Sequence, residues 1–246
     1  MTPTLADLPG LWRRQVLTAP GIEDRDTRVY WFQGASLFAD LRVPAGLPGT
    51  EGARCLADLG PQGLASLARC EGFAGETDVQ AGICRWTRRI NYQGPERGAD
   101  VGALRWGGSR DELIEEGVEA DYGEVWQRVG TGTPAARVYS GPDGQRAWLV
   151  WSDRWFLLAR ADPAAMSGAP LVEARAAGGD PWPRLDMEFA LGRWDRRLGI
   201  VELSTQPWRV GTAILARPQD AGALELTRMT PVGTGLAETW QPDPPA

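Results

Sequence analysis

The sequence predicts an all-β fold, built as two tandem antiparallel β-barrels with a short helix in the N-terminal half. Apolar and polar residues mostly alternate, and turn residues recur about every 8–12 positions, a pattern typical of sandwiches and barrels. Consecutive strands joined by short turns form meanders, and closure into barrels removes their exposed edges. A signature also repeats at nearly half the 246-residue chain, which favours two small barrels. One large antiparallel barrel built from two repeats is the alternative.

The repeated signature combines tryptophan with arginine. Arg85–Arg89 (RWTRR) returns as Arg193–Arg197 (RWDRR), and Trp12–Arg14 is a shorter copy near the N-terminus. Each longer copy is followed, after further apolar segments, by Glu-x-Trp-Gln, at Glu124–Gln127 and at Glu238–Gln241. Because the motifs keep the same order in both halves, they predict a duplicated β-unit.

The first half begins with a predicted hairpin, Arg28–Gln33 and Leu37–Val43, which ends at Pro44. The segment Leu56–Ala68 spaces its leucines as a short amphipathic helix does, although Gly60-Pro61 interrupts it. The remaining alternating segments predict strands at 72–78, 81–91, 101–106, 112–119 and 123–129.

The second half repeats this series. Ser140–Gly144 is a strong turn between predicted strands at Arg137–Tyr139 and Arg146–Trp151. The next hairpin strand is expected at Arg154–Ala161, and a loop rich in Gly, Pro and Ala, Asp162–Pro183, replaces the helix region. Further strands are expected at 186–191, 193–204, 208–216, 223–230 and 235–241.

The stretch Gly130–Ala136, rich in Gly and Thr, marks the boundary between the two units. We therefore expect an N-terminal barrel over residues 1–132 and a C-terminal barrel over residues 133–246. The last residues, Pro242–Ala246, predict a frayed tail.

Composition excludes several kinds of chemistry. The chain has no histidine, so it lacks an imidazole base, a Ser-His-Asp triad and a His-ligated zinc or haem. All 26 basic residues are arginine, which excludes Schiff-base and P-loop lysines. The net charge of −6 argues against nonspecific nucleic-acid binding. The 3 cysteines are too widely spaced for a metal cluster, and no apolar run is long enough to span a membrane. These features predict a cytoplasmic protein without metal or cofactor.

Gly10-Leu11-Trp12 resembles the Gly-x-Trp of the first strand in lipocalins and the wider calycin superfamily, and Gly192-Arg193-Trp194 is a second match, although it falls inside the second repeat. The order of elements resembles the tandem two-barrel Hri-type proteins of fungi and their uncharacterised bacterial relatives over most of the chain. In calycins this tryptophan packs across the closed barrel end with an arginine stacked on it, and the barrel holds a ligand cavity. The resemblance implies calycin-like barrels and no catalytic residues; haem-binding relatives need an axial histidine, which is absent.

Many of the 12 tryptophans stand next to arginine. Because sequence neighbours on a strand point to opposite faces, each arginine is expected to stack on a tryptophan of another strand. These pairs are interpreted either as barrel-closing plugs and outer-face stacks or as an aromatic pocket whose arginines hold an anionic ligand. The candidate ligand-binding residues of the first barrel are Trp12, Arg14, Trp31, Arg42, Trp86, Arg88, Tyr92 and Trp106.

An acidic run at 111–121 is expected to lie mainly on a solvated outer face. Glu112, Glu116 and Glu124 are separated by even numbers, so without a bulge they would share one face and could form an acid–base pair. Glu124 and Glu238 hold the same place in each repeat, which favours salt bridges to the Arg-Arg pairs over catalysis. The residues expected to be structural are Trp194, Arg196, Glu124 and Glu238.

The sequence thus favours a noncatalytic protein that binds a small apolar or weakly anionic ligand, or a protein partner. The alternative is a cofactor-free enzyme of the isomerase or cyclase type, which acts on a hydrophobic substrate through shape and an Arg/Glu/Tyr set. A third interpretation fills both barrels with side chains and makes the protein an interaction scaffold. No catalytic residue and no metal ligand is assigned.

Overall fold

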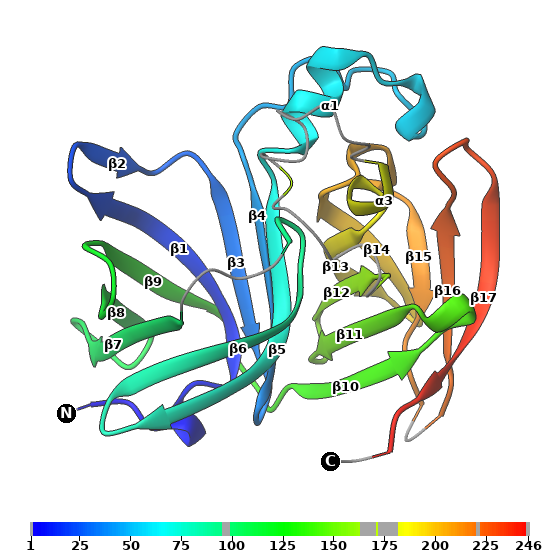
Figure 1. Ribbon diagram of the computed structural model, residues 1–246. Coiled ribbons are helices and arrows are strands. Elements are labelled where there is room, and N and C mark those ends of the chain that lie inside the picture. The colour runs from blue at the N-terminus through cyan, green and yellow to red at the C-terminus, as the bar shows by residue number, and fades with distance from the viewer. Residues whose placement is uncertain (1, 95–98, 163–170, 172–181, 220–221, 245–246) are drawn as a thin grey trace.

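The protein consists of two closed antiparallel barrels of 8 strands each, which follow one another along the chain and lie side by side (Figure 1). The structure, a computed structural model, describes residues 2–94, 99–162, 171, 182–219 and 222–244. The predicted all-β class and tandem barrels are confirmed, and the alternative of one large barrel is wrong because each sheet closes on itself.

The first barrel is a meander that closes by pairing of β1 with β9, while the short β2 pairs with the end of β1. The hairpin predicted from Arg28 to Val43 has the predicted strand bounds. The elements are η1 (Leu5–Asp7), β1 (Gly10–Ala19), β2 (Ile22–Asp24), β3 (Arg28–Gln33), β4 (Leu37–Val43), η2 (Leu56–Asp58), α1 (Pro61–Leu67), β5 (Glu71–Gln80), β6 (Ile83–Asn91), β7 (Asp100–Trp106), β8 (Glu112–Gly117) and β9 (Gly123–Gly130).

The second barrel closes in the same way, by pairing of β10 with β17. The elements are β10 (Ala135–Ser140), η3 (Pro142–Gly144), β11 (Arg146–Trp151), β12 (Trp155–Ala161), α3 (Trp182–Leu185), β13 (Glu188–Asp195), β14 (Leu198–Ser204), η5 (Pro207–Arg209), β15 (Ala213–Ala216), β16 (Leu224–Met229) and β17 (Gly235–Pro242).

Two strand predictions in this half are wrong. The strand expected at 193–204 is split, because Arg196-Arg197 forms a two-residue turn between β13 and β14, with Arg196 at a φ of 55°. The strand expected at 208–216 begins only at Ala213, after η5. Most of the loop expected at Asp162–Pro183 lies outside the described residues.

The predicted helical segment forms two short helices, η2 and α1, separated at Gly60-Pro61 as the sequence indicated. Pro61 takes the first helical position, where its fixed φ is favourable and its missing N–H costs no hydrogen bond. Leu56, Leu59 and Leu67 pack on apolar side chains of both barrels, and α1 lies above the junction between them (Figure 1). The helix therefore caps the contact between the barrels.

The most extensive apolar cluster in the described part of the chain lies between the barrels and combines residues of both. On β4, Ala39 and Leu41 belong to this cluster, whereas the alternating residue Phe38 belongs to the interior of the first barrel. On β12, Leu157 points to the same cluster and its neighbour Phe156 points into the second barrel. Both strands are therefore buried on both faces, which explains their nearly continuous apolar sequence.

Both barrels follow one strand plan. Gly75 on β5 pairs with Phe38 and follows a bulge, and Gly192 on β13 pairs with Phe156 and follows a bulge. The ladder thus equates Gly192 with Gly75, although the sequence comparison aligned it with Gly10. Trp86 lies on β6 and Trp194 on β13, which are not equivalent strands. The repeated RWxRR motif therefore does not mark equivalent positions.

The two bulge glycines should be the least replaceable positions of the sheets. A Cβ at Gly75 would lie 1.9 Å from the Thr87 carbonyl oxygen, and a Cβ at Gly192 would lie 2.1 Å from that of Ile200. Because backbone must move to relieve these contacts, we expect Gly75→Ala and Gly192→Ala each to lower the free energy of unfolding by at least about 2 kcal/mol. Urea unfolding measures this loss. Gly235→Ala on β17, where no atom lies within 4 Å of the new Cβ, is the control, and equal losses at all three sites would refute the bulge explanation.

Candidate functional site

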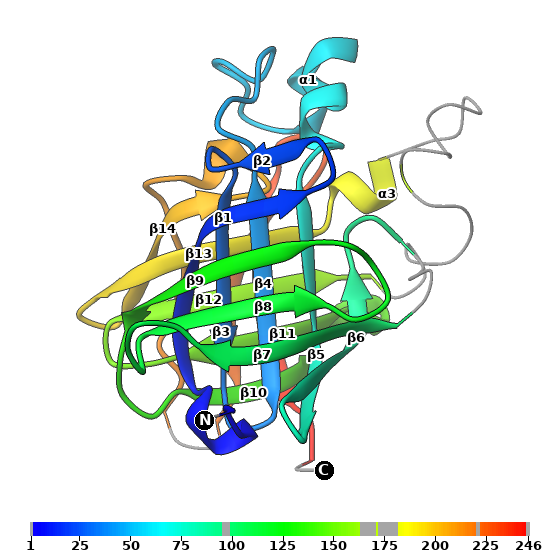
Figure 2. The same ribbon diagram turned by 90° about the vertical axis from the view of Figure 1, so that its left-hand side faces the viewer.

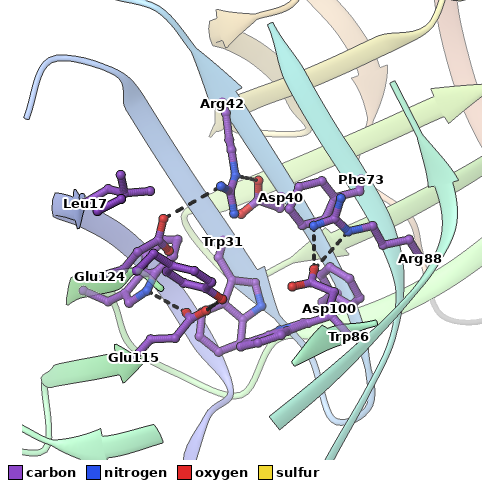
Figure 3. A pocket seen from close by; sticks show the side chains of 14 residues that line it. Leu17, Trp31, Asp40, Arg42, Phe73, Trp86, Arg88, Asp100, Glu115 and Glu124 are labelled. Atoms are coloured by element: carbon purple, nitrogen blue, oxygen red, sulfur yellow. Dashed lines mark hydrogen bonds and ion pairs between the residues drawn. The ribbon is translucent and has the colours of Figure 1, made fainter. Parts of the chain in front are cut away.

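The interior of the first barrel contains a cavity of about 260 Å³ (Figure 3). This volume exceeds that of a benzene-sized cavity, about 150 Å³, and is slightly below the range of about 300–1,000 Å³ for drug-sized ligands. A molecule of one or two small rings therefore fits. The lining residues are Leu17, Ala19, Trp31, Phe38, Asp40, Arg42, Phe73, Trp86, Arg88, Asp100, Glu115, Tyr122, Glu124 and Trp126.

One end of this barrel is closed by Trp12. The indole Nε1 of Trp12 donates a hydrogen bond to the Leu8 carbonyl oxygen (2.8 Å), and the guanidinium of Arg128 lies 4.2 Å from the Trp12 ring centroid. Trp31 stacks on the other side, with 6.1 Å between ring centroids. This is the Trp–Arg plug that the calycin resemblance implies for Trp12. Strand β2 and the C-terminal part of β1 lie at the other end of the barrel, away from the N-terminus (Figure 2).

Aromatic rings form the walls above this plug. Trp31 makes edge-to-face contacts with Trp86 and Trp126, at centroid distances of 5.7 and 5.9 Å. Phe38 and Phe73 form a second edge-to-face pair at 6.2 Å. These contacts hold the rings in fixed positions, so the cavity is shaped before any ligand enters.

Two arginines line the cavity, and a carboxylate holds each of them. Both Nε and Nη2 of Arg88 donate to Asp100 Oδ2, at 2.9 and 2.6 Å, while its guanidinium lies 3.6 Å from the Phe73 centroid. Arg42 Nε donates to Asp40 Oδ1 at 2.9 Å. The two guanidiniums are therefore compensated within the protein (Figure 3).

Arg14 forms a further ion pair behind the cavity wall. Its Nη1 donates to Glu124 Oε1 (2.7 Å), and its Nη2 donates to Asp24 Oδ2 (2.6 Å). Arg42 also approaches Glu124, with 3.8 Å between Nη1 and Oε1. Glu124 thus pairs with arginines of β1 and β4, and Arg14 belongs to the Arg13-Arg14 pair that follows Trp12, whereas Arg88-Arg89 on β6 does not take part. Strand β9 neighbours β1 in the closed barrel, and β6 is not its neighbour.

Glu115 differs from the other carboxyl groups of the cavity because neutral donors hold it. It accepts hydrogen bonds from the Tyr122 hydroxyl (2.8 Å) and the Trp126 indole (3.1 Å), and it lies directly opposite Glu124 in the β8–β9 ladder. No guanidinium of the described residues forms an ion pair with it. Burial, with a smaller contribution from Glu124, raises the pKa of Glu115 to about 8. At neutral pH the group is therefore largely protonated.

Asp40 is also buried, and its pKa is raised to about 6 by desolvation, against the opposing charge of Arg42. The cavity thus contains two carboxyl groups with raised pKa values, Glu115 and Asp40. Perturbed titration in an enclosed site is typical of functional sites, although structural ion pairs also produce it.

Glu112 and Glu116 lie on the outer face, as predicted for most of the acidic run, but Glu124 points into the barrel, so the three glutamates do not share a face. Glu116 points outward and pairs with Arg105 at 3.2 Å, with both side chains more than half exposed, whereas Glu115 points inward. Glu112 is also on the outer face, bonded to the amide of Gly108. Leu113 stands two positions before Glu115 and is buried on the same face of β8. This apolar residue is the sequence signal that could have identified the inward face.

The structure brings together part of the predicted ligand-binding set. Trp31, Arg42, Trp86 and Arg88 line the cavity, and Trp12 and Arg14 contact it from behind. The other two members of the predicted set lie away from the cavity. Trp106 packs against Trp12 at the closed end, and Tyr92 packs between the barrels, 6.2 Å from Phe189, with its hydroxyl donating to the Leu67 carbonyl oxygen. The lining residues that the sequence interpretation missed are Leu17, Ala19, Phe38, Asp40, Phe73, Asp100, Glu115, Tyr122 and Trp126.

The residues expected to be structural in the second barrel have local partners. Glu238 accepts hydrogen bonds from Arg228 Nε (2.7 Å) and from the indole of Trp240 (3.0 Å). Trp194 packs on Phe156 at 5.0 Å and donates to the Ser152 carbonyl oxygen. Arg196 lies in the exposed β13–β14 turn. Glu238 therefore pairs within the β16–β17 hairpin and not with Arg196-Arg197.

The second barrel carries leucine at two positions where the cavity of the first carries a carboxyl group, although it also buries an ion-pair network of Arg160, Glu188 and Arg209. By ladder register, Asp40 corresponds to Leu158, and Glu115 corresponds to Leu226. These leucines belong to a packed cluster with Tyr139, Leu149, Phe156, Val201, Ile214 and Trp240. At these two positions the same strand plan thus places apolar packing in one barrel and cavity-lining carboxyl groups in the other.

Two properties of the described residues concern membranes and metal ions. No helix there is both long and apolar enough to cross a membrane. No group of three or more Cys, Asp or Glu side chains is arranged to hold a metal ion in the same part of the chain.

No protein-family model and no curated protein matches this chain. Among solved structures, the chain is similar to the uncharacterised protein YLR301w from Saccharomyces cerevisiae, with a TM-score of 0.57 and 12% sequence identity over 96% of this chain and 98% of that one. At this identity the similarity shows a shared two-barrel fold, and the function of this chain has to be argued from its own cavity.

Proposed function

We propose that this protein binds a small organic molecule inside its first barrel. The observation that carries the proposal is the cavity of about 260 Å³, walled by indole and phenyl rings and lined by charged side chains. Small-molecule sites typically combine an apolar wall with a few polar groups that fix orientation. Burial of charged groups is costly, and the second barrel closes on the same plan with leucines in place of Asp40 and Glu115. Carboxyl groups at these two positions are therefore not needed to build the barrel.

We further propose a distant relationship to the calycins. The buried Trp12 with Arg128 stacked on it, at the closed end of an antiparallel barrel, supports this relationship. Calycins use the barrel interior as a ligand site, which agrees with the placement of the cavity here.

A second candidate function is acid–base catalysis on a bound substrate. Glu115 supports it, because a buried carboxyl group with a pKa of about 8 can donate or accept a proton near neutral pH. Binding without conversion favours the first proposal, and the appearance of a new product from the bound molecule favours the second.

The cavity can be blocked from its half-buried lining residue Ala19, at the end of β1. We expect Ala19→Phe to place a ring in the cavity and to abolish binding of small aromatic and aliphatic probes, while the barrel stays folded. Ala213→Phe on the exposed side of β15 adds the same ring elsewhere and should leave binding unchanged. Thermal shift and ligand-observed NMR against a small-fragment panel measure this.

Mass spectrometry of protein purified from its natural host adds a direct readout. A small molecule that co-purifies with the unmodified protein and with Ala213→Phe, but not with Ala19→Phe, is the expected result. If no fragment binds and no molecule co-purifies, the proposed function is wrong. If Ala19→Phe retains full binding, the ligand lies outside this cavity.

A further inference from the structure

Carboxyl groups outnumber guanidiniums around the cavity of the first barrel. Four carboxyl side chains but only two arginines line it, and the carboxyls are Asp40, Asp100, Glu115 and Glu124. A third arginine, Arg14, reaches Glu124 from behind and is shared with Asp24. The arginines are thus fully engaged, and the carboxyl groups are in excess.

Both arginines in the described lining of the cavity already have carboxylate partners. Arg88 gives two hydrogen bonds to Asp100, and Arg42 lies between Asp40 and Glu124. An anion would have to displace one of these carboxylates, and a displaced carboxylate that stays buried is left without a partner. The weakly anionic ligand that the sequence indicated is therefore the less favourable choice.

Among the carboxyl groups that line the cavity, Glu115 is the one that forms no ion pair with a described arginine. Its side chain is 4% exposed and lines the cavity, and its two hydrogen bonds come from the neutral Tyr122 hydroxyl and Trp126 indole. The charged groups that face it are Glu124 and Arg42 from β9 and β4, and Asp100 from β7. A positive charge brought into the cavity would supply the missing counter-ion and favour the ionised form of Glu115.

The walls near Glu115 also favour a cation. Trp126, whose indole bonds to Glu115, packs edge-on against Trp31, and Trp31 packs edge-on against Trp86. The π-faces of indole rings attract ammonium groups within about 6 Å, most strongly in desolvated sites. The Glu115 carboxyl group and the three indole rings therefore line the same cavity, where all of them could contact one bound cation.

We infer that the first barrel takes a small organic cation, a protonated amine or a quaternary ammonium, with its charge held by Glu115 and the rings of Trp31, Trp86 and Trp126. The inference rests on the proposed function and narrows it to one ligand class. An organic cation suits the site better than a metal ion, because aromatic rings form much of its wall and the described carboxyl groups are not arranged as metal ligands.

Matched probes separate charge from shape. Choline and 3,3-dimethylbutan-1-ol differ in one atom and one charge, and 2-phenylethylammonium, 2-phenylethanol and 3-phenylpropionate have similar sizes with positive, neutral and negative charge. By isothermal titration at pH 7.5, we expect each cation to bind at least about tenfold more tightly than its neutral partner. The anion should bind most weakly.

Substitution at adjacent positions tests the role of Glu115. Glu115→Gln should lower the affinity for both cations at least about tenfold and leave the affinity for both alcohols unchanged. Glu116→Gln removes the neighbouring carboxylate from the outer face and should change neither. Because the alcohols report an intact pocket in each variant, a loss confined to the cations cannot come from misfolding. Trp86→Leu should lower the affinity for choline more than that for dimethylbutanol.

These experiments distinguish failure of the cation inference from failure of the proposed small-molecule binding. If the alcohols bind as tightly as the cations, or the phenylpropionate binds best, the cation inference is overturned and small-molecule binding stands. Equal losses in Glu115→Gln for cations and alcohols also overturn it. If no probe of any charge binds and no molecule co-purifies with the protein, the proposed function itself fails.

Discussion

Glu115→Gln is expected to stabilise the protein, by an amount that grows as the pH rises. In the folded protein the pKa of Glu115 is raised from 4.5 to about 8 by burial. Between these two values the unfolded chain has lost the proton and the folded chain retains it, so the stability of the unsubstituted protein falls as the pH rises through this window. Glutamine mimics the protonated form and does not titrate.

The expected gain is large for a single substitution. One pKa unit corresponds to about 1.4 kcal/mol, so a shift of several units amounts to a few kcal/mol. For a chain of this size, that should raise the melting temperature by on the order of 5–10 °C at pH 8. The gain should be small near pH 4.5, increase up to about pH 8 and stay constant above it. The raised pKa of Asp40 is present in both proteins and cancels in the difference.

Differential scanning calorimetry at a series of pH values measures this effect. Glu116→Gln is the matched control, because Glu116 is exposed on the outer face, and its difference from the unsubstituted protein should stay flat. A flat difference for Glu115→Gln as well would show that Glu115 titrates normally, and a loss of stability at high pH would show that its charge is compensated in the folded protein.

Glu188→Gln is expected to destabilise the second barrel severely. Glu188 is 0% exposed and accepts a hydrogen bond from Arg209 Nε at 3.0 Å, while Arg160 Nε lies 4.0 Å from its other oxygen. Both arginine side chains are almost fully buried. Glutamine keeps the shape but leaves the buried Arg209 without its counter-ion and Arg160 with Asp186 alone, 3.8 Å away. Breaking a buried ion pair in this way typically costs about 3–5 kcal/mol. The melting temperature should fall by on the order of 10 °C.

An exposed ion pair of the same barrel is the control. Glu202 pairs with Arg193, and both side chains are more than one third exposed. Since exposed pairs contribute about 0–1 kcal/mol, Glu202→Gln should change the melting temperature by only a few degrees at most. Thermal unfolding followed by circular dichroism compares the two variants. Equal effects would show that the Glu188 cluster is hydrated and not a buried network.

Much of the fold was predictable because strands and turns depend on neighbouring residues. The bounds of β3, β4 and β11 agree with the predicted ranges, since alternation and flanking turn residues define them. The strand prediction at 193–204 was wrong because a turn formed by two arginines lacks the usual turn residues. Arg196 accepts a left-handed φ that glycine takes more readily.

The candidate site was predicted only in part because it depends on which face of a strand points inward. A shift of one residue in the assumed alternation moves every side chain of a strand to the opposite face of the sheet. For this reason the sequence suggested Glu116 as an acid–base residue, whereas Glu115 lines the cavity. Bulges in β1 and β5 also alter the alternation. The predicted site residues were chosen mainly from the tryptophan and arginine motifs. Asp40 and Asp100 belong to no such motif, and no local pattern separates them from surface carboxylates.

The sequence by itself determined the all-β class, the two tandem barrels, the broken helix after β4 and the absence of histidine and lysine chemistry. All of these depend on composition or on residues close together in the chain. Only the tertiary structure decided that β1 closes on β9, that the barrels share an apolar contact, and that Glu115 lacks a cationic partner. Ladder pairing and burial bring together residues far apart in sequence, and the pKa of a carboxyl group depends on all the charges and solvent around it.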